Sequence, residues 1–259
     1  MARAIWKGVV RVGGRRVPVR LYAAVADRAV HFRLLHAKDR TPVRQRMVNP
    51  RTGNEVPRAE IRQGYEIERG VFVRLTPADL ERAEPDDTRD ITVDRFVDAD
   101  AIGPEWYERP YWLAPDAKAT GDYAALATAL DRTGKIGLAH WVMRDREHTG
   151  ALRAHGEHLV LATLRSKDEV ITPTDLEPPA GRPPAEKELE LARQLVASLE
   201  GEFDPSAYRD EHRKRVLEFV QAKAKGRKMK LGRPARRRAP ASLAAALQAS
   251  LRAGKRRRA

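Results

Sequence analysis

The sequence predicts an α+β fold that is mainly β, and three observations support this prediction. Short runs of β-branched and other apolar residues, separated by Gly, Pro and Asn, recur through the first 172 residues, which is typical of antiparallel hairpins or a β-barrel. Apolar residues at helical spacing dominate only from residue 185 onward. With 259 residues, of which 42% are hydrophobic, the chain is long enough to bury a sizeable core.

Five short runs before residue 76 are expected to be strands. They are VVRV, VPVRLY, VHFRLL, VRQRMV and GVFVRL, at residues 9–12, 17–22, 30–35, 43–48 and 70–75. Because successive side chains of a strand point to opposite faces, a strand over 43–48 would place Arg44 and Arg46 on one face. This strand would lead into the Asn-Pro-Arg-Thr-Gly turn and present a cationic edge. The alternative is an exposed hairpin whose arginines are only solvated.

Helices and strands should then alternate up to residue 172. Thr76-Pro77-Ala78-Asp79 combines an N-cap, a Pro at the first helical position and an acidic third residue, so we expect a short helix to about Ala83. A second helix over Asp122 to Arg132 should end at Gly134. Further strands are expected at ITVDRFV, YWLAP, IGLAHWVMR and HLVLATLR, at residues 91–97, 111–115, 136–144 and 158–165.

The C-terminal third begins with a proline-rich break. Residues 173–184 contain five prolines and no periodic pattern. Two amphipathic helices are predicted beyond it, one from Ala185 to Glu200 and one that starts at Asp204-Pro205, and they should form a helical hairpin. We therefore expect a core over residues 1–172, a linker over 173–184, a helical region over 185–225 and a basic tail over 226–259, with a short helix at 242–252.

Charge is distributed unevenly along the chain. Residues 1–74 hold 17 basic and 6 acidic side chains, residues 75–222 hold 19 and 30, and residues 223–259 hold 14 basic and no acidic side chains. Basic segments of this kind suggest a polyanionic partner, because each phosphate that is neutralised releases counterions. An anionic membrane is a poorer candidate, since no helix has the bulky apolar face of an interfacial helix.

The absence of cysteine excludes structural disulfides and thiolate zinc sites and suits a reducing compartment. No signal peptide precedes the first strand, and no apolar run approaches the roughly 20 residues that span a bilayer. We therefore expect a soluble, cytoplasmic, nucleoid-associated protein that makes no contact with membranes.

Three clusters were considered as enzyme sites. His148, His155 and His158 lie near Glu147 and Glu157, but without the helical pairing of hydrolytic zinc sites, so turn or surface histidines are the preferred interpretation. Asp86, Asp87 and Asp90 could hold a divalent cation for a nuclease, although an exposed acidic loop is preferred. The glycines of GVVRVGGRR lack the context of a phosphate-binding loop. We expect no catalytic residues, no metal and no cofactor, and a metal-dependent nuclease remains an alternative.

Cationic side chains recur on and between the predicted strands, where they could follow a phosphate backbone without reading bases. Aromatic residues are scarce in the same segment, which disfavours stacking on single strands and favours duplex DNA. The candidate DNA-binding residues are Arg33, Lys38, Arg40, Arg44, Arg46, Arg51, Arg58, Arg62, Arg69, Arg74, Arg144 and Arg146.

The tail contains Gly232-Arg233-Pro234 within KLGRPARRR, which resembles the core of an AT-hook that enters the minor groove. Leu231 precedes the glycine where that motif usually has a basic residue, so a generic basic arm is preferred. The candidate tail residues are Lys228, Lys230, Arg233, Arg236, Arg237, Arg238, Lys255, Arg256, Arg257 and Arg258. A nucleoid-type protein that coats or bridges DNA through this tail is the alternative function.

The order of motifs resembles that of the bacterial Ku proteins of non-homologous end joining. The resemblance covers residues 1–172 and includes MARAIWKGVV, VPVRLYAA, HFRLLHAKD, RQRMVNPRTGNEVP, IRQGYEIERGVFVRLTPADLE, ITVDRFVD, PYWLAPD, TGKIGLAHWVMRDREH and GEHLVLATLR. A second resemblance, to the short C-terminal helical region of that family, covers ELARQLVASLEGEFDPSAYRDEHRKRVLEFVQAKAKG.

The resemblance implies a Ku-type antiparallel β-barrel core with a bridge segment, here at about Arg40 to Asp98. Two copies would form a ring-shaped homodimer that threads onto double-stranded DNA ends and recruits and stimulates an ATP-dependent DNA ligase during double-strand break repair. Residues 185–225 are the candidate ligase contact. Where members of the family often carry a Cys pair, this chain has Asn49 and Thr52, so thiol or metal chemistry is not expected there.

Overall fold

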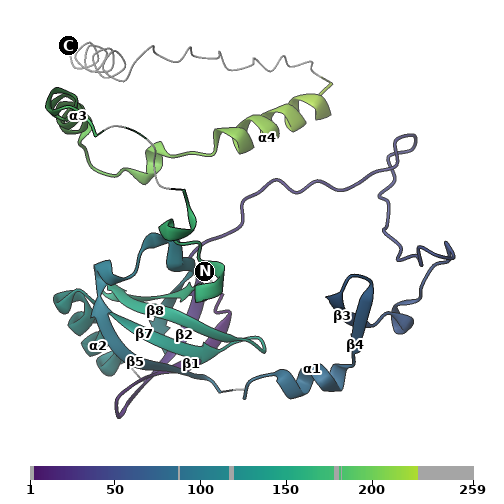
Figure 1. The fold of residues 1–259 in the computed structure, drawn as a ribbon, viewed down its shortest axis with the longest axis horizontal. Helices are drawn as coiled ribbons and strands as arrows, with labels where there is room; N and C mark the ends of the chain where they lie inside the picture. The colour runs from purple at the N-terminus through teal and green to yellow at the C-terminus, as the bar shows by residue number, and fades with distance from the viewer. Residues whose placement is uncertain (1–2, 87, 117–119, 178–180, 182, 227–259) are drawn as a thin grey trace. The chain divides into compact units, whose positions relative to one another are not determined.

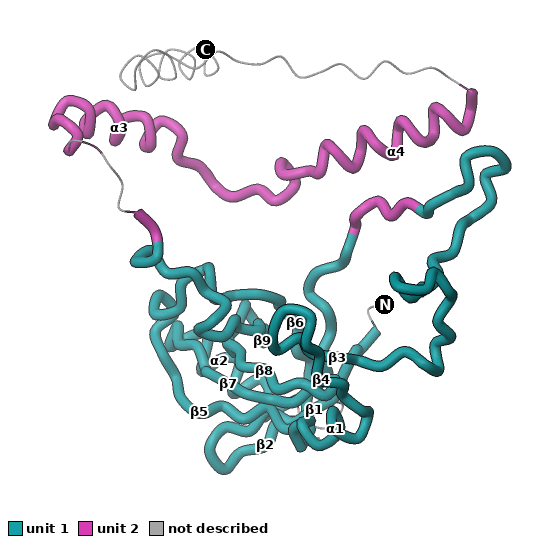
Figure 2. The backbone as a smooth tube through the Cα atoms, turned by 45° about the vertical axis from the view of Figure 1, so that its right-hand side comes forward, with its two compact units in different colours: residues 1–27, 33–175 teal, residues 28–32, 176–259 magenta. Residues whose placement is uncertain are grey.

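The computed structural model describes residues 3–86, 88–116, 120–177, 181 and 183–226. These residues belong to two compact units, one formed by residues 1–27 and 33–175 and the other by residues 28–32 and 176–259 (Figure 2). The first unit contains the β-barrel, and the described part of the second unit contains α-helices.

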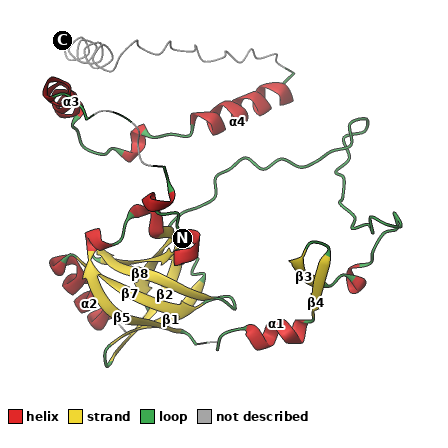
Figure 3. Cartoon of the chain, in the orientation of Figure 1, coloured by secondary structure: helices red, strands yellow, loops and turns green. Residues whose placement is uncertain are grey.

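Seven strands of the first unit close into a barrel (Figure 3). In spatial order they are β1 (Trp6–Val12), β2 (Arg15–Ala23), β6 (Tyr107–Pro115), β9 (His158–Leu164), β8 (Glu147–His155), β7 (Lys135–Val142) and β5 (Asp90–Asp98). All neighbouring pairs are antiparallel except β1 and β5, which run parallel with Val10 opposite Ile91. The predicted antiparallel barrel is therefore confirmed, with one parallel pair closing it.

The barrel core follows from the alternation along each strand. In β2, Val17, Val19 and Leu21 are buried, while Arg16 and Pro18, on the opposite face of the strand, are exposed. The same inward set on the other strands includes Val10, Ile91, Leu113, Trp141, Leu152, Leu159 and Leu161. Burying each Val or Leu side chain contributes about 1.5–3 kcal/mol relative to leaving it exposed, so the barrel has its own stabilising core.

Helix α2 (Thr120–Thr133) packs beside the barrel (Figure 1). Tyr123, Ala127 and Leu130 are its buried residues and lie on one helical face. The Tyr123 hydroxyl donates to the Leu113 carbonyl at 2.6 Å and accepts from the Leu159 amide at 2.8 Å. These two bonds link α2 to β6 and β9, and Gly134, with φ of +62°, ends the helix as the sequence predicts.

Between Ala23 and Asp90 the chain leaves the barrel, and we call residues 33–89 of this excursion the arm. The arm contains the antiparallel pair β3 (Gln63–Glu68) and β4 (Val71–Leu75), followed by α1 (Pro77–Ala83). Helix α1 starts with the expected capping box, in which the Asp79 amide donates to the Thr76 hydroxyl at 3.2 Å and the Thr76 amide donates to the Asp79 carboxylate at 2.9 Å. No described residue of the arm is buried.

Several predicted elements of this region differ in the structure. The prediction of strands at residues 30–35 and 43–48 is wrong. These segments form only the isolated bridges Leu35–Pro42 and Val48–Glu55, because no neighbouring strand among the described residues completes a ladder with them. The bridge was placed at about Arg40 to Asp98, whereas residues 90–98 form β5 of the barrel. Two strands, β3 and β8, were not predicted.

The second unit contains α3 (Glu186–Leu199) and α4 (Glu211–Ala224). The first was predicted almost to the residue, but the second does not start at Asp204-Pro205. A 3-10 turn over Pro205–Ala207 occupies that position, and α4 begins later because the Asp210 carboxylate accepts from the Arg213 amide at 2.8 Å. That the two helices form a helical hairpin stays a prediction.

Short 3-10 turns occupy Arg58–Glu60, Ala99–Ala101, Pro104–Trp106, Lys167–Glu169 and Pro173–Asp175. The tail residues from 227 onward, including the helix predicted over 242–252, lie outside the described residues. Across the described ranges, no helix is both long and apolar enough to cross a bilayer.

Candidate nucleic-acid interface

The arm exposes every cation that the sequence singled out in this segment. Ten side chains of the predicted DNA-binding set lie in the arm, and all ten residues are exposed: Arg33, Lys38, Arg40, Arg44, Arg46, Arg51, Arg58, Arg62, Arg69 and Arg74. The contrast in charge within the arm is also clear, since residues 33–62 hold eight basic and three acidic side chains whereas residues 63–89 hold four and seven. The first half of the arm is therefore the cationic part.

Most of these cations have no partner among the described residues. Arg46 is one exception, because its Nη1 lies 2.6 Å from a carboxylate oxygen of Glu55. Arg62 is the other, because its Nη1 donates to the backbone carbonyls of Ala59 and Ile61 at 2.5 and 2.9 Å. Arg44, Arg51 and Arg58 make no ion pair within the described ranges and are free to meet an anion.

The turn at residues 49–53 holds this part of the arm in shape. The Asn49 side-chain oxygen accepts from the Arg51 amide at 2.9 Å, and the Asn49 carbonyl accepts from the Gly53 amide at 2.8 Å. Gly53 has φ of +73°, a conformation that glycine adopts without strain. Asn49 therefore has a structural role in this turn, at a position where the sequence led us to expect no thiol chemistry.

The remaining two predicted residues, Arg144 and Arg146, lie in the turn between β7 and β8. Arg144 and Asp145 both have positive φ, of 55° and 61°, and the Met143 amide donates to the Arg146 carbonyl at 2.9 Å. Both arginines are exposed. They belong to the barrel and not to the arm.

A second cationic surface, which the sequence analysis missed, lies on the outward face of β1 and β2. The register places Lys7 opposite Arg20 and Arg11 opposite Arg16. Like charges directly opposite on a sheet are destabilising, so this arrangement is unfavourable unless anions offset it. The alternating cations of WKGVVRV and RRVPVRLYA are visible in the sequence. Which cation lies opposite which depends on the register of the two strands, which the sequence does not give.

Two carboxylates partly offset these charges. Asp90 lies 2.8 Å from Arg11 and 3.5 Å from Arg16, while Asp116 pairs with Arg20. The hydrogen bond and the charge of Asp116 raise the pKa of Arg20 above its ordinary value. Among the described residues Lys7 has no ion pair, so the β1–β2 face keeps a net positive charge that could meet phosphate.

Several side chains that were considered for catalysis contact tryptophan rings or form ion pairs with arginines in the structure. His148 stacks on Trp141 with ring centroids 5.4 Å apart. His155 and His158 each form a T-shaped pair with Trp112, with ring centroids 5.7 and 6.0 Å apart. Asp90 is the partner of Arg11 and Arg16, and Asp87 lies outside the described residues. Within the described ranges, no group of three or more His, Asp or Glu side chains is arranged to hold a metal ion.

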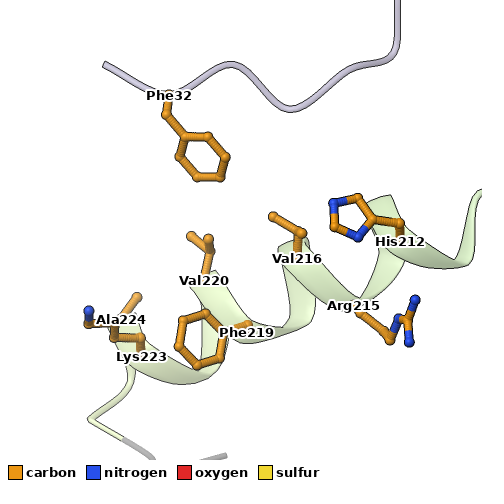
Figure 4. A pocket seen from close by; sticks show the side chains of 8 residues that line it. All are labelled: Phe32, His212, Arg215, Val216, Phe219, Val220, Lys223 and Ala224. Atoms are coloured by element: carbon orange, nitrogen blue, oxygen red, sulfur yellow. The ribbon is translucent and has the colours of Figure 1, made fainter. Parts of the chain in front are cut away.

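A separate apolar groove of about 680 Å³ lies in the second unit. Val216, Phe219 and Val220 of α4 line it, and Phe32 points toward Val220 from the segment 28–32 (Figure 4). His212, Arg215 and Lys223 also line the groove. An apolar floor with a cationic border is suited to a protein partner with apolar and acidic side chains.

The comparisons with known proteins agree on one family. A family model described as the Ku70/Ku80 beta-barrel domain matches residues 11–191. The chain is similar to the non-homologous end joining protein Ku of Anaeromyxobacter sp. (strain K), with 40% identity over 99% of this chain and 88% of the relative. It is also similar to the non-homologous end joining protein Ku 2 of Geotalea uraniireducens, with 37% identity over 89% of each chain, and to the non-homologous end joining protein Ku of Pseudomonas aeruginosa, with 36% identity over 86% of this chain and 78% of the relative.

Proposed function

The chain belongs to the Ku family of non-homologous end joining proteins, and on that premise we propose that it acts as a homodimer that encircles double-stranded DNA ends. The arm of each copy supplies the closing part of the ring. DNA enters only through a terminus, so topology and not base readout provides the specificity for ends. In this role the protein binds and positions DNA and carries no catalytic residues of its own.

One observation supports this proposal most strongly, namely the composition of the arm. Its first half presents exposed, mostly unpaired arginines and no buried side chain. Cations that meet phosphates fix a protein on the duplex without reading sequence. A ring that slides over any sequence needs contacts of this kind, and Arg44 and Arg51 are the residues best placed to make them.

The ligase contact is proposed for the second unit. The α4 groove, with Val216, Phe219 and Val220 as its apolar floor, is the preferred surface for an ATP-dependent DNA ligase. Replacing Phe219 and Val220 with Ser should abolish stimulation of the ligase while DNA-end binding stays unchanged. Equal stimulation by the variant and the unmodified protein would remove α4 from this role.

A comparison of linear and covalently closed circular duplexes of the same sequence tests the ring. The chain used should lack residues 227–259, because a basic tail binds circles as well as ends. We expect the shortened chain to bind the linear duplex and to show no stable binding to the circle. Equal affinity for both forms would contradict the proposed function.

The basic tail favours a second candidate, a nucleoid-type protein that coats or bridges DNA. Residues 227–259 hold 12 basic and no acidic side chains. Under this alternative, deletion of the tail removes all DNA binding, whereas the ring retains binding to ends. In the ring model the tail adds affinity and nucleoid association, and this added affinity should fall steeply as salt rises.

A further inference from the structure

The β3–β4 hairpin has one apolar face that nothing in the described structure covers. The register pairs Tyr65 with Val73 and Glu68 with Val71, with a bulge between Glu66 and Glu68. Because alternate residues share a face, Tyr65, Val71, Val73 and Glu68 lie on the same side of the hairpin. Tyr65 is 69% exposed, and Val71 and Val73 are 49% and 45% exposed.

The acidic residue at the tip of this face is unpaired. Glu66, on the other face, accepts from the Gly70 amide at 2.8 Å and so holds the hairpin turn. Glu68 makes no ion pair within the described ranges. The hairpin therefore presents a compact apolar patch with a single free carboxylate beside it.

A groove of about 650 Å³ lies immediately before the hairpin in the arm. Met47, Val56 and Ile61 form its apolar part, and Met47 is 67% exposed. Arg46, Arg58 and Arg62 also line it. Since Arg46 is paired with Glu55 and Arg62 with backbone carbonyls, Arg58 is the lining cation without a partner among the described residues.

The groove and the hairpin are complementary in chemistry, but one copy cannot bring them together. Gln63 is both the last lining residue of the groove and the first residue of β3, so no linker is available for the hairpin to fold back. Two copies related by a twofold axis near this point can each place a hairpin in the groove of the other, which is an isologous contact. The opposite net charges of residues 33–62 and 63–89 favour the same exchange.

We propose that the hairpin of one copy docks in the arm groove of a second copy, with Tyr65 and Val73 against Met47 and Ile61, and Glu68 paired with Arg58 of the second copy. This inference rests on the proposed homodimer and assigns the residues that close it. It also assigns Arg58 to the contact between copies and leaves Arg44 and Arg51 for DNA. A duplex is a poor occupant of the hairpin face because that face is apolar and carries a negative charge.

A charge exchange tests the assignment in the full-length chain. Glu68→Arg and Arg58→Glu should each weaken dimerisation about a hundredfold, as measured by sedimentation equilibrium. A twofold dimer contains the ion pair twice, and the loss of each pair, at about 1.4 kcal/mol, is a factor of about ten. The chain that carries both substitutions should dimerise nearly as well as the unmodified protein, because the pair is restored with reversed polarity. The matched control is Glu81→Arg, an exposed acidic residue of α1, which should leave dimerisation unchanged.

Chemical cross-linking gives a second measurement that does not depend on rescue. The chain has no cysteine, so a Glu68→Cys chain mixed with an Arg58→Cys chain can form a mixed product with a short bis-maleimide only where residues 68 and 58 of different copies meet. We expect that product with this mixture and none when Glu81→Cys replaces Glu68→Cys. Circular dichroism checks that each variant keeps its barrel.

The outcomes separate this inference from the function on which it rests. Dimers that neither respond to the charge exchange nor form the mixed cross-link would contradict the hairpin contact and leave the ring intact. An unmodified chain that stays monomeric at the concentrations at which it binds ends would contradict the ring and this contact together.

Discussion

Individual arginines of the arm differ in how free they are to meet a phosphate. Arg44 is exposed and makes no ion pair within the described ranges, whereas Arg46 lies 2.6 Å from Glu55. An exposed ion pair contributes little to stability, but it offsets the charge that a phosphate would meet. The two residues should therefore contribute unequally to DNA binding.

Replacing Arg44 with Ala should weaken binding to all duplex sequences alike and reduce the slope of log K against log salt by about one. Arg46→Ala should have a smaller effect because Glu55 already neutralises part of its charge, and Glu55→Gln should strengthen binding.

The double variant Arg44→Glu, Arg46→Glu should lose about 2–4 kcal/mol of binding free energy if both side chains lie near phosphates. Fluorescence anisotropy over a salt series measures each case, and a sequence-dependent loss would show that base readout had been overlooked.

Tyr123 is the polar residue on which the packing of α2 depends. Replacing it with Phe leaves the Leu113 carbonyl and the Leu159 amide without their partner, and each buried group left unsatisfied costs about 1–3 kcal/mol. Tyr123→Phe should therefore lower the free energy of unfolding in urea titrations. Tyr107→Phe, a change of the same kind on β6, should have little effect.

The same residue predicts a response to alkaline pH. Burial raises the pKa of the Tyr123 phenol above its ordinary value of 10.0, and the hydrogen bond from Leu159 opposes this only in part. The unfolded chain thus loses this proton first as pH rises, so the stability that the group contributes is present below pH 10.0 and is lost above it. Stability measured from pH 8 to 11 should fall more steeply for the unmodified protein than for Tyr123→Phe.

At the scale of elements, the β1–β2 hairpin places cations directly opposite one another, an arrangement that lowers the stability of the sheet. Lys7 faces Arg20 and Arg11 faces Arg16. Replacing Lys7 and Arg16 with Gln removes two like-charge repulsions of up to about 1 kcal/mol each, so the thermal midpoint should stay the same or rise. Binding to DNA ends should weaken with a lower salt slope, because phosphates would lose two partners.

The matched control for this hairpin is Arg153→Gln on β8. Arg153 is also exposed on the barrel, but it faces Val160 and not another cation. A fall in DNA binding half as large in the control as in the β1–β2 variant, in proportion to the one and two charges removed, would show that only net charge matters. Unchanged binding in both would exclude this face of the barrel as a contact.

Local signals were sufficient to predict some elements and not others. The capping box of α1, the glycine after α2 and the alternation in β2 and β5 are properties of neighbouring residues, and the structure confirms each of these elements. Residues 43–48 have the alternation of a strand but form only an isolated bridge at Val48. A strand also needs a partner, and the sequence pattern does not say whether one is present.

The sequence was sufficient to predict which cations of the arm belong to the candidate site, but not which residues they pair with or face. Which cations are exposed could be inferred from charge alone, and all ten cations that were predicted in the arm are exposed. That Glu55 holds Arg46, or that Lys7 faces Arg20, depends on turn geometry and strand register. The start of α4 was misplaced for a similar reason, because both Asp204 and Asp210 are good caps and only the later one begins an α-helix.

At the scale of the whole molecule, the arm is the segment whose apolar side chains are left exposed in a single copy. None of its described residues is buried, and Met47, Tyr65 and Phe72 are more than 60% exposed. Extensive exposed apolar surface of this kind marks an interaction site. A second copy that covers this surface would complete a ring, and the cationic first half of the arm would then be available to the DNA within it.

Order of addition on an end-blocked duplex tests the ring most directly. The chain without residues 227–259 is mixed with a linear duplex that carries biotin at both ends, and streptavidin is added either before or after the protein. We predict that protein added first stays on the DNA through a high-salt wash, because blocked ends trap a closed ring, and that protein added second does not load. Equal retention in both orders, or no retention in either, would contradict an encircling dimer.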